Sequence, residues 1–80
     1  MNNIFESIKE ERKRQDEKWG PSSHHPMEWS SILMEEVGEV SKEVNDYTFN
    51  SKDSTEMKKE LIQVAAVVVA WLEDIESKCG

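Results

Sequence analysis

The chain has 80 residues, which is enough for a single domain, residues 1–80. A chain of this length buries only about 60% of the surface that its unfolded form exposes, so its core is marginal and self-association is expected. The formal net charge of −7 argues against a nucleic-acid polymer as the main partner, because such proteins neutralise phosphates with clustered Lys and Arg.

Cys79 is the single cysteine, so the chain forms no internal disulfide and offers no cysteine-based zinc site. Its first residues lack the basic start and apolar run of a secretory signal. The longest apolar stretch, residues 61–72, is about eight residues shorter than the roughly 20 needed to cross a bilayer. We therefore expect a soluble, cytoplasmic protein that does not enter the membrane.

The first predicted helix runs from about Asn3 to Lys18, and its few apolar residues lie on one side: Ile4, Phe5 and Ile8. The segment Trp19–Pro26 ends this helix, because Gly20 and the two prolines do not continue it. His25 is predicted to cap or line this loop, and Pro26 suits the first turn of the next helix.

The second predicted helix runs from Pro26 to about Tyr47. Apolar residues recur in it at spacings of three and four and form one stripe: Trp29, Leu33, Val37, Val40, Val44 and Tyr47. Within this stripe, Trp29 is expected in the core. The polar stretch Asn45–Ser54 is predicted to form the next turn.

The third predicted helix starts near Ser54, because Asp53 and Glu56 have the spacing of a capping box. From Leu61 to Leu72 this helix is apolar on nearly every face and must be covered on several sides. Two short helices cannot cover it, so a second subunit should pack there. The sequence thus predicts an all-α fold in which three helices form a bundle completed by oligomerisation, as a homodimer or homotetramer.

Acidic residues concentrate on the second helix. Lys42 is the single base between Met27 and Asp46, against the acids Glu28, Glu35, Glu36, Glu39, Glu43 and Asp46. At the α-helical pitch, Glu36, Glu39 and Glu43 fall within about 60° of one another. Glu60 and Gln63 stand one turn apart on the third helix. A short connection favours antiparallel packing, which brings both sets to one level.

Oxygen-bearing side chains in this arrangement suit Mg²⁺, which takes a few carboxylates, keeps several waters and binds substrate phosphates. An alternative is a plain solvated acidic face, since like charges one turn apart cost only about 0.2–0.5 kcal/mol per pair. Spacing therefore permits a metal site without requiring one. Gly38, between the key glutamates, indicates either close approach of a ligand or tight helix packing.

The string Glu35-Glu36-Val37-Gly38-Glu39-Val40, followed by Glu60-Leu61-Ile62-Gln63-Val64, resembles the MazG-like, all-α nucleoside triphosphate pyrophosphatase family. Its signature is E-E-x-x-E on one helix and E-x-x-D on the next. Further segments are similar to phage and integron-type members: Glu11-Arg12-Lys13-Arg14-Gln15, Lys18-Trp19-Gly20 and His25 to Trp29. The resemblance covers most of the chain.

This resemblance implies hydrolysis of a nucleoside or deoxynucleoside triphosphate to the monophosphate and pyrophosphate, for sanitation or control of the nucleotide pool. Glu36, Glu39 and Glu60 would hold Mg²⁺, for which Mn²⁺ can substitute. Glu35 is a further candidate for metal binding or for orienting the attacking water, and one of the glutamates would act as base. Gln63 departs from the signature Asp: its oxygen can still ligate, but it is neutral and cannot be a base.

Trp19 could stack on a nucleobase, with Lys18, Arg14 or Arg12 meeting phosphates, or it could close the core at the helix end. Gln15, one turn before Trp19, could hydrogen-bond a base edge. His24 and His25 have no third nitrogen or sulfur ligand, which argues against zinc. Trp71 is expected in the core or at a subunit interface, and Asp74 near another site across a dimer interface.

Three hypotheses remain open from the sequence. The first is an enzyme that releases pyrophosphate from nucleotides. The second is a nucleotide sensor that uses the same carboxylates but turns over little because of Gln63. The third is a non-catalytic acidic helical module that binds another protein through its apolar third helix.

Overall fold

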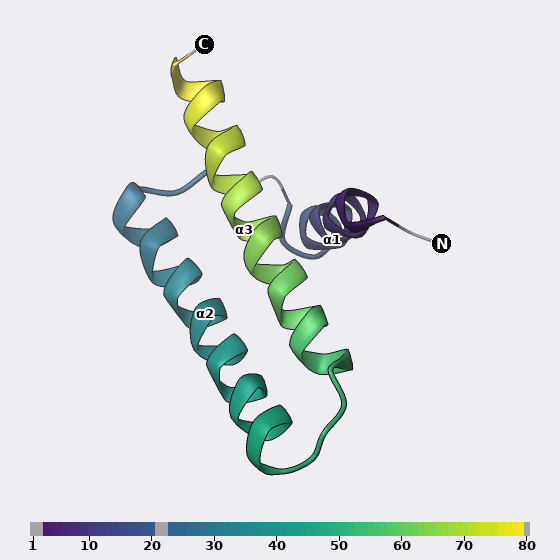
Figure 1. The fold of residues 1–80 in the computed structure, drawn as a ribbon. Coiled ribbons are helices and arrows are strands. Elements are labelled where there is room, and N and C mark those ends of the chain that lie inside the picture. The colour runs from purple at the N-terminus through teal and green to yellow at the C-terminus, as the bar shows by residue number, and fades with distance from the viewer. Residues whose placement is uncertain (1–2, 21–22, 80) are drawn as a thin grey trace.

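The computed structural model describes residues 3–20 and 23–79, and it confirms an all-α chain (Figure 1). Three helices pack together: α1 (Ile4–Trp19), α2 (Pro26–Phe49) and α3 (Thr55–Cys79). No strand occurs in these two ranges. Pro21, which contributed to the predicted break after the first helix, lies outside the described residues.

Helix α1 begins and ends close to the predicted positions. The side chain of Asn3 caps its start by accepting a hydrogen bond from the Glu6 N–H at 2.8 Å. At its end Gly20 has φ 76° and ψ 175°, a conformation that is essentially restricted to glycine. The Gly20 N–H donates to the Asp16 carbonyl at 2.8 Å, which closes the last turn.

His25 caps the start of α2, as the sequence predicts. Its Nδ1 accepts from the Met27 N–H at 3.1 Å, and its own N–H donates to Glu28 Oε1 at 2.9 Å. These reciprocal bonds form a capping box with histidine in the capping position. Pro26 occupies the first turn, where its missing N–H costs nothing.

Helix α2 continues to Phe49, so the predicted turn starts too early: Asn45–Phe49 is helical. The reason is a local pair, because Asn50 donates to Asp46 twice, from its backbone N–H to the carbonyl and from its side chain to Oδ1, both at 2.9 Å. These bonds satisfy the last turn of the helix. Ser51, with φ 55°, then reverses the chain.

Helix α3 starts at Thr55, one residue after the predicted start near Ser54. The Thr55 N–H donates to Asp53 Oδ1 at 3.0 Å, and the Lys58 N–H donates to the Ser54 carbonyl at 2.9 Å. The hydrogen bonds to Thr55 hold the pKa of Asp53 below its usual value.

The two long helices α2 and α3 lie side by side and antiparallel, and α1 lies on the other side of α3 (Figure 1). In that view α1 is seen almost end-on, so it crosses the pair steeply. Both α1 and α2 contact α3, and the described parts of α1 and α2 do not contact each other. Helix α3 is therefore the centre of the fold.

The core is small and centred on α2 and α3. Trp29 is buried, as expected, against Val67 and Ala70, with Ile32, Leu33 and Trp71 packed around them. The Trp29 and Trp71 rings stack with their centroids 6.4 Å apart. Helix α1 contributes no buried residue.

Much of the apolar surface stays uncovered in one chain. The apolar stripe of α2 is only half buried, since Val37, Val44 and Tyr47 are exposed. Helix α3 also exposes apolar side chains: Leu61, Val68, Leu72 and Ile75. The radius of gyration of 13.9 Å exceeds the roughly 12 Å of a compact domain of this length. No described helix is long and apolar enough to cross a membrane.

The turn residue Ser51 gives a test of this fold. We expect Ser51→Gly to raise the free energy of unfolding by up to about 1 kcal/mol, because glycine adopts a positive φ without a Cβ clash. The control Ser41→Gly, on an exposed position inside α2, should lower it by about 0.5–1 kcal/mol. Urea denaturation followed by circular dichroism measures both, and destabilisation by both glycines would contradict the turn geometry.

Candidate functional site

A cavity of about 540 Å³ lies where α1 and α2 diverge over α3. Its interior is apolar, formed by Trp29, Ile32, Val67 and Ala70. The remaining lining is polar or aromatic and comes from all three helices and the loop before α2: Glu11, Arg12, Arg14, Gln15, Trp19, Ser23, His24, Glu35, Glu36 and Gln63. Carboxylates and aromatic rings thus meet around one apolar space.

Glu36 is the half-buried carboxylate of this cavity. Burial raises its pKa most, and nearby carboxylates raise it further: those of Glu60, Glu39, Glu11 and Glu35. The pKa of Glu60 is raised for the same reasons, by burial and then by the charges of Glu39, Glu43 and Glu56. The predicted approach of the two helices at one level therefore occurs, and it concentrates negative charge.

Gln63 lies between the two carboxylates. With its nitrogen toward them, its amide donates to Glu36 Oε2 at 3.0 Å and to Glu60 Oε2 at 3.1 Å, and the amide orientation is assigned from these bonds. The amide thereby joins the second and third helices across the charged pair. Turned over, the same side chain presents an oxygen to the same point.

The other predicted acids are less closely gathered. Glu35 is exposed and lines the cavity, whereas Glu39 is exposed and acts on Glu36 and Glu60 through its charge. Glu43 points to the turn and pairs with Lys52 at 3.4 Å. As the side chains lie, no group of three or more His, Cys, Asp or Glu in residues 3–20 and 23–79 is arranged to hold a metal ion.

The donor chemistry of the cluster nevertheless fits a hard divalent cation. Glu36, Glu60 and Gln63 can all offer oxygen. Burial first, and then the neighbouring carboxylates, raise the pKa of Glu36 and of Glu60, and a cation would neutralise that negative charge. The exposed Glu39 side chain can rotate toward them. A bound ion requires these side chains to move closer together.

Glu11 joins the acidic end from α1, which the sequence did not indicate. Its side chain is only 13% exposed, and its charge contributes to the raised pKa of Glu36. Arg14 donates two hydrogen bonds to the Glu11 carboxylate, from Nε to Oε1 at 3.0 Å and from Nη2 to Oε2 at 2.7 Å. This pairing raises the pKa of Arg14. Gln15 donates to the same carboxylate at 3.3 Å. Only the placement of α1 could have identified Glu11.

Arg12 ties α1 to α3. Its guanidinium pairs with Glu73 at 3.0 Å and with Asp16 at 3.1 Å, and its side chain is 18% exposed. The positive charge of Arg12 is thus already matched by two carboxylates. Arg14, in contrast, stands more exposed on the cavity wall.

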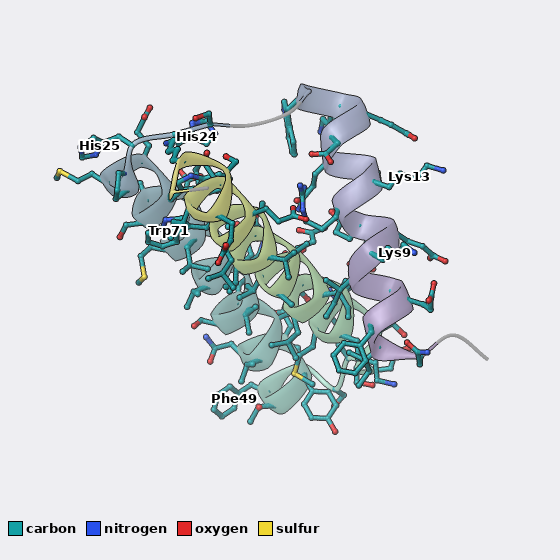
Figure 2. All side chains as sticks on the ribbon, turned by 90° about the horizontal axis from the view of Figure 1, so that it is seen from above. Lys9, Lys13, His24, His25, Phe49 and Trp71 are labelled. Atoms are coloured by element: carbon teal, nitrogen blue, oxygen red, sulfur yellow. The ribbon has the colours of Figure 1, made fainter. Side chains whose placement is uncertain are left out.

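Trp19 does not close the core, because its side chain is 65% exposed. It lines the cavity together with Gln15. Lys18 is not part of that lining, and its ammonium group lies 4.7 Å from the centre of the Trp19 ring. Figure 2 shows Lys9 and Lys13 directed away from the other helices.

Asp74, which the sequence places near another site across a dimer interface, has its observed hydrogen-bond partners within its own chain. Asp74 Oδ2 accepts from Trp29 Nε1 at 2.8 Å and from the His24 N–H at 3.2 Å. His24 lies beside the C-terminal part of α3 (Figure 2) and meets the Trp29 ring edge-on at 4.8 Å. Sequence spacing alone gave no sign of this cluster, because the loop and α3 are far apart in the chain.

Gly38 has no close neighbour within the chain. A Cβ added there would meet nothing within 4 Å, so neither tight packing of the described helices nor a crowded cavity wall explains the glycine. Nothing in the structure of one chain accounts for it.

The fold and the cavity define an all-α, three-helix protein with an acidic and aromatic pocket. Comparisons with protein-family models, with curated proteins and with solved structures found no match.

The charge around Glu36 predicts a pH-dependent stability. In chelator-treated buffer at neutral pH, Glu36→Gln should raise the free energy of unfolding by about 0.2–0.5 kcal/mol for each like-charge pair it removes. The advantage should vanish as the pH falls through the raised pKa of Glu36, because the native wild-type carboxyl then takes up a proton and the repulsion is relieved.

Urea titrations of both proteins from neutral pH to about pH 4 measure this difference. Glu76→Gln, which removes an exposed carboxylate from α3, is the control and should show no such trend. A Glu36→Gln protein that is less stable than wild type at neutral pH would contradict the repulsion at Glu36.

Proposed function

We propose that the chain is a Mg²⁺-dependent nucleoside triphosphate pyrophosphohydrolase. The observation that carries this proposal is the cavity of about 540 Å³ with Glu35, Glu36 and Gln63 in its lining together with Trp19. A nucleoside triphosphate has the matching parts, a polyanion that binds through divalent cations and a flat base that stacks on aromatic rings. The volume is in the range of small-molecule sites, about 300–1,000 Å³.

Glu36, Glu39 and Glu60 are assigned to hold Mg²⁺, with the Gln63 oxygen as a neutral ligand. When bound, the ion supplies positive charge that binds phosphate oxygens and offsets charge on the leaving group. Arg14, at the cavity wall, is assigned to a phosphate, for which it exchanges its pairing with Glu11. Trp19 and Gln15 are assigned to the base.

Hydrolysis joins a water oxygen to the α-phosphorus and breaks the bond from that phosphorus to the oxygen shared with the β-phosphate. The products are the nucleoside monophosphate and pyrophosphate. Glu35 is exposed and lines the cavity, so we assign its carboxylate to orient the water and accept its proton. Gln63 cannot take this role because an amide is not a base.

The direct test is pyrophosphate release from the common ribo- and deoxyribonucleoside triphosphates with and without Mg²⁺. We expect Mg²⁺-dependent release. The kcat should be at least about 100-fold lower in Glu36→Gln and Glu39→Gln, and about 10²–10⁴-fold lower in Glu35→Gln. Circular dichroism checks that each variant folds. Glu76→Gln, on an exposed part of α3, should keep full activity.

Release of no pyrophosphate from any common or modified nucleotide would refute the enzyme. If nucleotide with Mg²⁺ raises the melting temperature without turnover, the chain is a sensor instead, because a ligand of the native state stabilises it. Gain of turnover in Gln63→Asp would support that second reading.

We further propose that a second copy covers the outer face of α3. The exposed residues Leu61, Val68, Leu72 and Ile75 fall within about 60° of one another on the helix, roughly opposite the buried Ala70. Their spacings of seven, four and three residues are those of a helix seam in a coiled coil. A homodimer along this seam would bury the apolar surface that α3 leaves open in one chain, and a homotetramer could build on it.

Leu72→Lys and Val68→Lys test this interface. Wild type should have at least twice the 9.3 kDa mass of one chain in light scattering coupled to gel filtration, and the variants should shift toward one chain because a buried charge in the seam is costly. Phe5→Lys, at an exposed position of α1, is the control and should leave the mass unchanged. A monomeric wild type would rule the seam out.

A further inference from the structure

Asp74 is only 7% exposed, and it is the one charged residue that is buried in the described part of the chain. Donors from three segments converge on its Oδ2: Trp29 Nε1 of α2 at 2.8 Å, the His24 N–H of the loop at 3.2 Å and Lys78 Nζ of α3 at 3.2 Å. Lys78 Nζ also donates to the His24 carbonyl at 3.0 Å. The backbone of His24 is therefore held on both its polar groups.

This cluster fixes one wall of the cavity. His24 and Trp29 both line the cavity, and the His24 ring stands edge-on to the Trp29 ring at 84°. The bond to Asp74 sets the rotation of the Trp29 indole about its side-chain bonds, while Trp71 stacks on the indole with an angle of 10° between the rings. Figure 2 shows His24 and Trp71 at the same end of the bundle.

A buried carboxylate is costly unless its hydrogen bonds are satisfied. The bonds from Trp29, His24 and Lys78 overcome the effect of burial and hold the pKa of Asp74 at about 2. An apolar residue here could fill the same space, but it could not orient an indole N–H and a loop amide together.

We propose that Asp74 is a positioning residue that holds His24, backed by the buried Trp29, as the cavity wall against which the flat base of a bound nucleotide packs. The role rests on the proposed function, and it concerns affinity for the base rather than the hydrolytic step. Asp74 itself touches no substrate. Its effect is transmitted through His24 and Trp29, which belong to the apolar and aromatic part of the cavity.

The test compares Asp74→Asn with wild type and with Glu76→Gln, an exposed neighbour on the same helix. In the free protein, the indole N–H resonance of Trp29 should move in Asp74→Asn and not in Glu76→Gln. With Mg²⁺, Asp74→Asn should raise KM at least about tenfold with kcat within about threefold, because binding and not chemistry is affected. Affinity for α,β-imido nucleoside triphosphates, which resist hydrolysis, should fall equally.

Two further variants keep the test decisive if Asp74→Asn folds poorly. Lys78→Met removes one donor and leaves the Trp29 bond, so it should raise KM by less. His24→Ala removes part of the wall itself and leaves the hydrogen bond between Trp29 and Asp74 in place, so it should reproduce the higher KM. All measurements are made below the melting temperature of each variant.

The outcomes separate the two proposals. If wild type binds the analogues and the variants bind equally well while the Trp29 resonance moves, Asp74 only stabilises the fold and the positioning role is overturned. If wild type neither binds nor hydrolyses any nucleotide, the proposed function is refuted, and the positioning role of Asp74, which depends on it, is refuted as well.

Discussion

Every contact between helices in the described chain involves α3, because α1 and α2 each pack against it and not against one another. The small side chains of Ala66 and Ala70 are buried on α3. The steep crossing of α1, held by Arg12 on Glu73, keeps it apart from α2. The cavity exists for this reason, since it is the space that two helices leave when they share a third.

The same arrangement brings negative charge together. The turn after α2 is short, so α3 returns antiparallel and sets Glu60 near Glu36, while α1 adds Glu11 from the opposite wall. Basic side chains pair with the carboxylates at the edge of this cluster: Arg14 with Glu11 and Lys52 with Glu43. Burial and the neighbouring carboxylates nevertheless keep the pKa of Glu36 raised, so the ionised carboxylate at the centre of the cluster carries a cost in free energy. That cost is the physical basis for expecting a cation there.

Sequence periodicity and capping patterns predicted the helices well, because both are local: the Asp53 cap and the His25 cap are each made within a few residues. The end of α2 was misplaced because polar residues that suggest a turn instead satisfy the helix end through Asp46. The approach of Glu36 and Glu60 followed from antiparallel packing.

The contributions of α1 and of the loop before α2 could not be predicted in this way. Helix α1 buries no residue, so its apolar pattern does not show which side of the helix faces α3. The role of Glu11 depends on which side that is. The role of Gln63 could not be predicted from the sequence either. Its neutral amide donates to both Glu36 and Glu60, where an Asp would add a further repelling charge. The carboxylates can therefore assemble without a cation. If Gln63 is to bind a metal through its oxygen, its amide must turn over and lose its hydrogen bonds to both carboxylates, which costs free energy. The metal therefore binds well only when a bound polyphosphate supplies enough additional binding energy to offset that cost.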